Sequence, residues 1–281
     1  MHKRTWATPV RYLVLTLLVI ASLFPIYYVL INSVKTSTEF AQNQLALPTS
    51  FQWSNFVRAW DQVARPMLNS TVIVAVSVAG ILLLSSLAAF AFAFLQFPGK
   101  RILFGLVFGL LLIPGFLTLI PLYLQIRRLP DEISSTYLAV ILPYIAGGQA
   151  FSIFVLKTFF EGISKELLEA ARIDGAGDLR IFRSIALPLS VPVLASVAII
   201  NLVPLWNDYL LPNLIIGRDN RALQTISMAL VEFQGSPQSQ TATQFGALMA
   251  SYALAAVPLI LVFSLLMRYY VEGVTSGAVK S

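Results

Sequence analysis

Six apolar runs constrain this chain more than any other feature, because each is long enough to cross a bilayer. A hydrocarbon core of roughly 30 Å requires about 20 predominantly apolar residues in a helix. The runs cover residues 12–32, 71–95, 102–124, 137–160, 191–214 and 247–269. Each is expected to be helical, because a strand edge facing lipid would leave backbone groups unpaired. The sequence therefore predicts an all-α integral membrane protein with about six transmembrane helices.

The composition excludes an ordinary soluble domain, since 57% of the 281 residues are hydrophobic and only 11% are charged. Lys3, Arg4 and Arg11 precede the first run as in a secretory signal, but the run is too long and no small-residue cleavage site follows. We therefore expect an uncleaved span with a cytoplasmic N-terminus. An even number of spans then places the C-terminus in the cytoplasm as well. We expect cytoplasmic tails at 1–11 and 271–281 around a transmembrane domain at 12–270.

This topology agrees with the charge pattern. Lys and Arg are more frequent in the segments it places inside than in those it places outside, as the positive-inside rule requires. The net charge of +6 then needs no nucleic acid as a partner.

The sequence offers no catalyst. It has no cysteine, and its one histidine, His2, lies in the N-terminal tail, which excludes a metal cluster or a nucleophile paired with histidine. The tail from Gly273 has a superficial phosphate-loop look, but Gly277 follows too closely and Lys280 is not adjacent to it. We expect no enzyme, no metal and no cofactor bound by this chain. The sequon at Asn69 is expected to be incidental.

A polar segment at 161–188 interrupts the apolar pattern between the fourth and fifth runs. Ser164 is a plausible N-cap, with Glu166 in the first turn of the helix that follows. Gly175 can end that helix in the left-handed conformation, and Asp178 is expected to cap a second helix that runs to Pro188. The segment is therefore predicted to be a rigid elbow, with a plain solvated loop as the alternative.

Side-chain spacing on the first helix of this elbow supports a short exposed helix. Lys165 and Glu169 stand four apart, and Glu169 and Arg172 three apart, so each pair shares a face. Ala170 and Ala171 are small enough for another surface to approach closely.

The elbow resembles the EAA loop of ATP-binding-cassette importer permeases in the spacing of Glu169-Ala170-Ala171, Gly175, Ile185 and Leu187-Pro188. Four other stretches are similar to the carbohydrate-importing branch, and most of all to the shorter permease of maltose-like systems: Phe97-Pro98-Gly99-Lys100-Arg101, Ile141-Leu142-Pro143-Tyr144, Trp206-Asn207-Asp208 and the tail from Gly273 to Lys280. Residues 129–135 depart from the glycine-containing turn usual there, which affects only an outer loop.

The resemblance implies a type I importer permease fold with a cytoplasmic EAA coupling helix, in the inner (plasma) membrane of a prokaryote. It implies import of a sugar together with a second, related permease, two ATPase subunits that bind ATP and Mg, and an extracytoplasmic binding protein. The tail at 277–280 would reach toward the ATPases. The implied ATPase-coupling residues are Glu169, Ala170, Ala171, Arg172, Asp174, Gly175, Ile185, Leu187 and Pro188.

Five polar residues within the apolar runs are candidates for a substrate pathway: Tyr144, Gln149, Ser152, Asn207 and Asp208. A charge at the bilayer centre is costly, so Asp208 is expected to face a partner or a wet cavity. Two alternatives stay open. Asp208 equally fits a structural role near the outer end of its span, and the other polar groups fit bridges between helices.

Two outer segments are candidate contacts for a binding protein. Trp53, Phe56, Val57, Trp60, Val63 and Met67 recur at helical spacing, which also fits an amphipathic helix anchored at the membrane interface. Residues 232–243, rich in Gln, Ser and Gly, predict a flexible loop.

Other functions compete with sugar import. An importer permease for amino acids or glycerol phosphate differs least, and the Trp206-Asn207-Asp208 segment and the tail favour carbohydrate over it. An ion-coupled secondary transporter is a weaker alternative, because the chain shows no convincing internal repeat.

Overall fold

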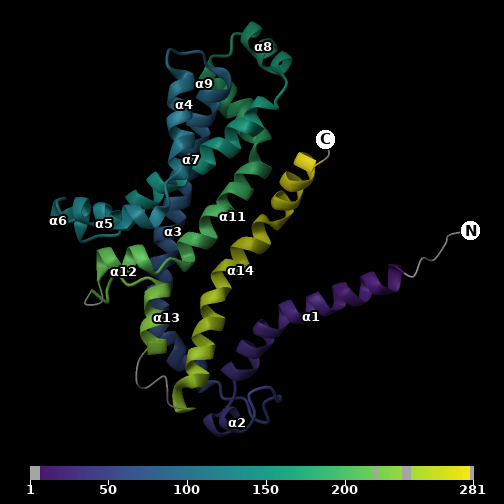
Figure 1. Cartoon of the computed structure of the whole chain (residues 1–281), viewed down its shortest axis with the longest axis vertical. Helices are drawn as coiled ribbons and strands as arrows, with labels where there is room; N and C mark the ends of the chain where they lie inside the picture. Colours follow the sequence, from purple (N-terminus) through teal and green to yellow (C-terminus); the bar gives the residue numbers. More distant parts are fainter. Residues whose placement is uncertain (1–6, 218–219, 236–241, 279–281) are drawn as a thin grey trace, which may run out of the picture. The chain divides into compact units, whose positions relative to one another are not determined.

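A computed structural model describes residues 7–217, 220–235 and 242–278. Over these residues the chain forms helices joined by turns, without a strand, which confirms the predicted all-α fold (Figure 1). The chain divides into two compact units. One comprises Met1–Arg65 and Ala229–Val257, and the other comprises Pro66–Met228 and Pro258–Ser281.

The first unit contains α1 (Ala7–Ser33), α2 (Ser37–Gln42) and the first turns of α3 (Ser54–Phe94). It also takes in most of α13 (Ile226–Gly235) and the first half of α14 (Ala242–Ala278). The apolar window of α1 is only 6% buried. Such a helix is stable where lipid or another protein covers it, as expected of the first span.

Polar side chains fix the connection between α1 and α2. Lys35 is 2% exposed, and its ammonium donates to the carbonyls of Asn43 and Gln44 at 3.0 and 3.1 Å. The Asn55 amide, from the start of α3, donates to the carbonyls of Ser33 and Lys35, both at 3.0 Å. These bonds pair groups that would otherwise be buried and unsatisfied.

Glu39 links the start of α2 to the segment that follows this helix. Thr36 and Glu39 form a capping box at the start of α2. The Glu39 carboxylate also accepts from the hydroxyl and, at 2.8 Å, the backbone N–H of Thr49. The Thr49 hydroxyl first, and then backbone donors, lower the pKa of Glu39 from 4.5 to about 2.

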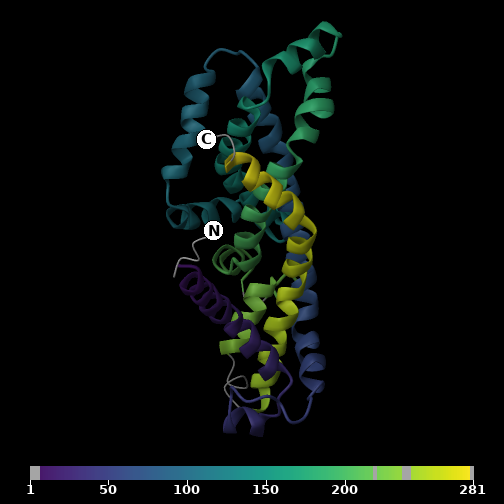
Figure 2. The same ribbon diagram turned by 90° about the vertical axis from the view of Figure 1, so that its right-hand side faces the viewer.

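The second unit contains the rest of α3, the first residues of α13, the part of α14 from Pro258, and the helices between α3 and α13. In chain order these are α4 (Lys100–Gly109), η1 (Leu110–Leu112), α5 (Gly115–Ile126), α6 (Asp131–Ser134), α7 (Leu138–Glu161), α8 (Lys165–Ile173), α9 (Asp178–Ile181), η2 (Phe182–Ala186), α10 (Leu187–Leu189), α11 (Val191–Asn207) and α12 (Leu210–Ile216). α8 and α9 project from one end of this unit (Figures 1 and 2).

Two of the six predicted spans are broken. Four helices are long and apolar enough to cross a membrane, or up to six if each of two bent pairs is one span. The bent pairs are Lys100–Leu112 with Gly115–Ile126, and Asp178–Leu189 with Val191–Asn207. The prediction of one helix at 102–124 is wrong, because Pro114 follows an extended Ile113 and the helices on either side meet at 102°. The helix predicted at 191–214 ends at Asn207, where Asp208 is extended and α12 then begins.

α3 and α7 pack closely in the second unit through glycine. A Cβ atom at Gly80 would lie 2.5 Å from the Ile145 side chain, and one at Gly148 would lie 2.4 Å from Ile81. A larger residue at either position would displace the isoleucine side chain that faces it. One apolar cluster around Phe90 and Phe160 supports the α8 to α10 region, and another around Tyr144 and Leu211 supports α12.

The outer segments differ from the sequence prediction in two ways. The amphipathic helix is no separate element but the start of α3, which continues through Pro66 because the helix tolerates proline there. This part of α3 buries Asn55, Ala59 and Val63 and exposes Val57 and Trp60, and Trp53 is exposed just before the helix begins. The loop predicted at 232–243 is helical up to Gly235 and again from Ala242, while 236–241 lie outside the described residues.

Candidate functional site

The first half of the elbow is a helix with well-formed ends. Ser164 caps α8 as predicted, since its Oγ accepts the N–H of Leu167 at 3.4 Å. The same hydroxyl donates to the Glu166 carboxylate, and this hydrogen bond lowers the pKa of Glu166. The first turn therefore carries an ionised group where the helix dipole favours one.

The predicted stop at Gly175 is confirmed in detail. Gly175 has φ of 80°, and its N–H bonds to the Arg172 carbonyl at 3.0 Å. The N–H of Ala176 bonds to the Ala171 carbonyl at 2.9 Å. This pair of bonds is a Schellman motif, which fixes the direction in which the chain leaves the helix.

The ion pairs and the second cap differ from the prediction. Arg172 pairs with Asp178 at 3.1 Å across the turn, and neither predicted pair involving Glu169 forms in this described segment. Asp178 is not the N-cap, because that position is Gly177 and Asp178 is the first residue of α9. Its carboxylate serves as the partner of Arg172 instead, so the side chain links the two helices of the elbow.

The second helix does not end at Pro188 as predicted. A π-helical stretch lets the Leu187 N–H bond to the Phe182 carbonyl, and the helix continues through Pro188 to Leu189. A widened turn accommodates a proline, which lacks the N–H that a regular α-turn requires. Ser190 closes this helix with a bond from its Oγ to the Leu187 carbonyl at 2.8 Å.

The elbow has one face buried in the second unit. Leu168, Ile181 and Phe182 are at most 5% exposed and belong to the cluster around Phe90 and Phe160. Phe182 meets Phe90 at 5.4 Å between ring centroids, close to perpendicular. The elbow is therefore seated on α3 and α7.

The opposite face carries large apolar side chains without cover in this chain. Ile173 is 86% exposed, Leu179 is 65% exposed and Leu167 is 44% exposed. Apolar surface of this kind at a loop indicates a protein contact site. Sequence reasoning missed these three residues. For Ile173 the sequence did offer a signal. It lies four residues after Glu169, which places the two side chains on one helix face.

The predicted coupling residues fall into two groups. Those on the exposed surface are Glu169, Ala170, Arg172, Asp174, Gly175 and Pro188. Ala171, Ile185 and Leu187 instead pack against the buried cluster and support the elbow from beneath. Within the first group, Glu169 and Ala170 lie four and three residues before Ile173 on α8, so these three share one exposed helix face. The coupling roles of both groups stay predictions.

Two of the predicted pathway residues meet in the second unit. The Tyr144 hydroxyl, from α7, donates to the Asp208 carboxylate at 2.9 Å. The other Asp208 oxygen accepts the N–H groups of Leu210 and Leu211, at 2.9 and 3.4 Å, at the start of α12. Asp208 therefore joins α7, α11 and α12, which fits the structural alternative for this residue.

The other three pathway residues use their polar groups nearby. Asn201 donates to the buried Ser152 hydroxyl at 3.1 Å, so Ser152 bridges α7 and α11. The Gln149 and Asn207 amides donate to carbonyls of their own helices, Ile145 and Val203, each at 2.8 Å. Asn207 is exposed. A role of these residues toward a sugar stays a prediction.

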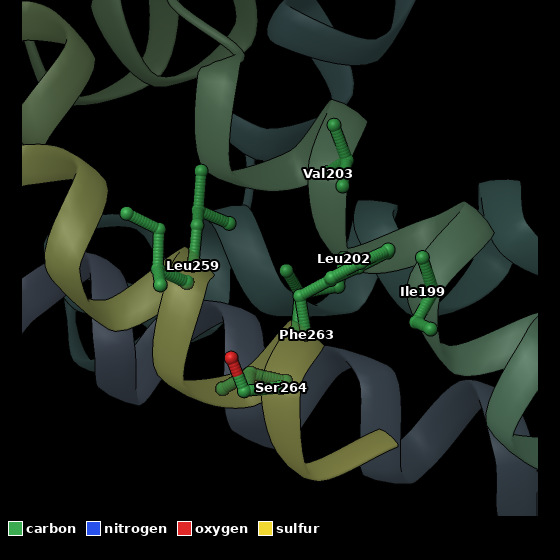
Figure 3. A pocket seen from close by; sticks show the side chains of 8 residues that line it. Ile199, Leu202, Val203, Leu259, Phe263 and Ser264 are labelled. Atoms are coloured by element: carbon green, nitrogen blue, oxygen red, sulfur yellow. The ribbon is translucent and has the colours of Figure 1, made fainter. Parts of the chain in front are cut away.

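An apolar groove of about 260 Å³ lies between α11 and α14 (Figure 3). Ile199, Leu202 and Val203 line one side, and Leu259 and Phe263 line the other, with Ser264 nearby. Saccharide hydroxyls need several hydrogen-bond partners. One serine hydroxyl cannot supply them, so this groove is not a sugar site.

The asparagine of the sequon, Asn69, uses its side chain for hydrogen bonds within the chain. The Asn69 amide nitrogen donates to the carbonyls of Ala222 and Gln224, and its oxygen accepts from the Tyr137 hydroxyl. The tail at 277–280 lies largely outside the described residues. Over the described ranges, no three His, Cys, Asp or Glu side chains form a metal-binding group.

Residues 81–276 match the family model described as "Binding-protein-dependent transport system inner membrane component". The chain is 34% identical to "Probable ABC transporter permease protein YurM" of Bacillus subtilis, over 95% of this chain and 86% of that one. It is 30% identical to "Melibiose/raffinose/stachyose import permease protein MelC" of the same species, over 99% and 98%.

A solved structure has the same fold. The chain matches a chain of a bacterial ABC transporter involved in the import of the acidic polysaccharide alginate, with a TM-score of 0.80 and 19% identity. The match covers 96% of this chain and 100% of the other. The type I importer permease fold predicted from the sequence is therefore confirmed.

Proposed function

The chain belongs to the family of binding-protein-dependent transport system inner membrane components, and on that premise we propose that it is the permease subunit of an ATP-driven sugar importer. As a member of this family it is a multi-pass membrane component of an ABC transporter. We propose that it pairs with a second, related permease, that two separate ATPase subunits hydrolyse ATP, and that a binding protein delivers the solute. Both termini then lie in the cytoplasm.

The observation that carries this proposal is the elbow with Ile173, Leu179 and Glu169 on its exposed face. Residues at the centre of protein interfaces are typically large side chains that fill a pocket on the partner. Ile173 fits that role in a groove of an ATPase subunit. Glu169 would add a charged contact at the rim, where charge sets specificity more than affinity.

The seat of the elbow supports a mechanism of coupling. Leu168, Ile181 and Phe182 lock it to the cluster on α3 and α7. When the ATPases close on ATP, they would carry the elbow with them, and α3 and α7 would move because the packing between them is rigid. The bound state of the ATPases then shifts the permease between its inward-open and outward-open conformations.

A sugar is the proposed solute because relatives at 30% to 31% identity are named for saccharides. They include permeases for diacetylchitobiose in Streptomyces coelicolor and trehalose in Mycobacterium tuberculosis, besides the melibiose system. Tyr144, Gln149, Ser152, Asn207 and Asp208 remain the proposed polar groups near the path.

Copurification from detergent tests the proposal. We would compare the native chain with Glu169→Lys and Gly175→Pro, and score recovery of the ATPase and of the second permease. The expected result is loss of the ATPase with the second permease retained, because Glu169→Lys changes the exposed surface of the elbow and Gly175→Pro breaks the turn that shapes it. Glu169→Gln is the matched control for charge reversal. Failure of any ATPase to copurify with the native chain in several detergents would contradict the importer function.

A further inference from the structure

A basic pocket of about 680 Å³ lies where α3, α4 and α7 meet at the end of the second unit that also bears the elbow. Lys100 and Arg101 open α4, and Lys157 comes from the last turns of α7. Glu161 is the one carboxylate in the lining, so cations outnumber anions by three to one.

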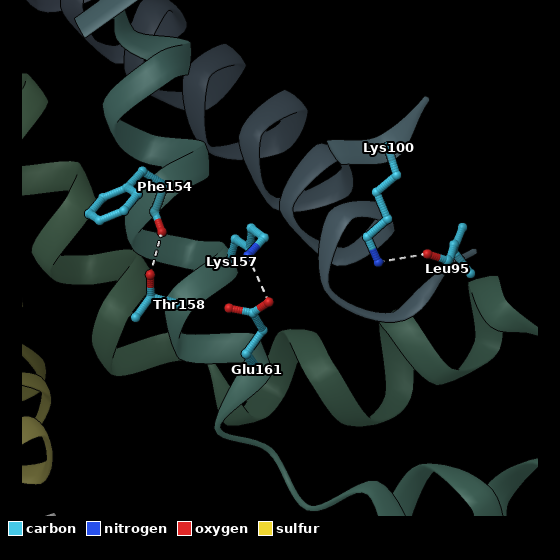
Figure 4. Close-up of polar contacts among 6 residues, drawn as sticks. All are labelled: Leu95, Lys100, Phe154, Lys157, Thr158 and Glu161. Atoms are coloured by element: carbon cyan, nitrogen blue, oxygen red, sulfur yellow. Dashed lines mark hydrogen bonds and ion pairs between the residues drawn. The ribbon is translucent and has the colours of Figure 1, made fainter. Parts of the chain in front are cut away.

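The contacts of these cations leave positive charge available. Lys157 pairs with Glu161 at 2.6 Å, and its side chain is 16% exposed (Figure 4). Lys100 donates one hydrogen bond, to the Leu95 carbonyl at 2.8 Å. A carbonyl carries no net charge, so the positive charge of Lys100 is not neutralised by this bond. Arg101 is exposed. After the Lys157 and Glu161 pair is set aside, the charges of Lys100 and Arg101 remain.

The floor of the pocket is aromatic. Phe92 lies between Phe97 and Phe104, at 5.9 and 5.5 Å between ring centroids. The Lys157 ammonium lies 4.4 Å from the centroid of the Phe104 ring, a cation–π contact that holds it in place. A ligand in this pocket would therefore meet both positive charge and apolar surface.

An apolar track continues from the pocket along α4. Ile102, Leu103 and Leu106 are 71%, 48% and 64% exposed. In a membrane these side chains contact acyl chains, directly beside the basic residues that begin the same helix.

We propose that this pocket binds the phosphate headgroup of an anionic phospholipid, with its acyl chains along α4. Basic pockets between membrane helices on the cytoplasmic side suit such headgroups. The apolar track favours a lipid over free phosphate, which has nothing to place there. Assignment of the pocket to the cytoplasmic leaflet rests on the proposed function, whereas the binding itself does not.

Native mass spectrometry of the purified transporter complex tests this site. The complex would be reconstituted in phosphatidylcholine nanodiscs containing phosphatidylglycerol, and retained phosphatidylglycerol would be counted after release. Lys100→Gln with Arg101→Gln should weaken retention roughly fivefold for each charge removed, since each cation near an anionic surface contributes about that much. Arg101→Gln alone tests the exposed residue, whose loss leaves the fold intact.

The matched control is Arg127→Gln with Arg128→Gln, an adjacent basic pair at the end of α5 outside the pocket. It should leave retention unchanged. Equal retention in both double variants would overturn the site, and so would displacement of the lipid by millimolar inorganic phosphate, which would indicate a free-anion site. Because the assay reads bound lipid, and copurification reads ATPase recovery, failure of this site and failure of the proposed function give different results.

Discussion

The side chains of two polar connections in this chain point in opposite directions, inward in one and outward in the other. Between α1 and α2, Lys35 and Glu39 turn inward and bond to their own backbone. Between α7 and α11, Glu169 and Ile173 turn outward. A connection that satisfies its own polar groups needs no partner, whereas one that exposes a large apolar side chain on a well-capped helix offers a surface. The difference separates residues that stabilise this protein from residues that recognise others.

The largest effect is expected from Ile173→Asp in the outward connection. Because Ile173 is 86% exposed, the change should leave thermal stability unaltered. Loss of a central interface residue typically costs about 2 kcal/mol or more, or roughly thirtyfold in affinity. ATPase recovery after detergent extraction measures it, with Ile173→Leu as the control. Unchanged recovery would remove Ile173 from the interface.

Lys35→Met in the inward connection should lower thermal stability, whereas Ile173→Asp should not. Lys35→Met removes the charged donor of the Asn43 and Gln44 carbonyls, of which Gln44 keeps the Asn32 amide at 3.1 Å, at a cost of about 0.5–1.5 kcal/mol for each hydrogen bond lost. A thermal melt of the purified complex measures the loss, and Lys165→Met on the exposed face of α8 is the control. Stability equal to that of the native chain would show that the connection is not held by this ammonium. ATPase recovery should be unaffected.

Acid should release the Glu39 network. Its pKa is lower in the folded state, about 2 against 4.5, so its stabilising effect is present above pH 4.5 and is lost as the pH falls toward 2. Melts of the native chain and Glu39→Gln should therefore differ at pH above 4.5 and converge at the acid end. Parallel melts across that range would contradict the assigned hydrogen bonds.

The smallest effect is expected from Arg172→Gln, which breaks the ion pair across the elbow. Both side chains are about half exposed, at 48% and 51%. Pairs of this kind contribute roughly 0.2–1 kcal/mol. Double-mutant cycles with Asp178→Asn measure the coupling. A coupling well above this range would indicate that the pair, and not the Schellman turn, holds the elbow in shape.

Local chemistry in the sequence was enough to predict the ends of α8. Ser164 and Gly175 act through bonds to residues within a few positions, so their roles follow from neighbours in the chain. Asp178 was misassigned because its partner, Arg172, reaches it only after the turn has folded. Ile173 was missed because its spacing places it on one helix face with Glu169 but does not show whether the rest of the chain covers that face.

Proline shows the same limit within the membrane segments. Pro143, Pro204 and Pro258 lie inside continuous helices, whereas Pro114 marks a 102° bend. Neighbouring helices decide whether a proline is absorbed or breaks a span. Those neighbours are tertiary, so the predicted number of spans was right at its upper bound while two of the boundaries were wrong.

Cross-linking from residue 173 tests the central claim most directly. The chain has no cysteine, so Ile173→Cys supplies a single thiol for a short photoactivated cross-linker in membranes that contain the whole transporter. Trp60→Cys, 52% exposed and placed on the outer side by the proposed topology, is the control. The account predicts an adduct with the ATPase subunit from residue 173 and none from residue 60. No ATPase adduct from residue 173, or equal adducts from both positions, would contradict it.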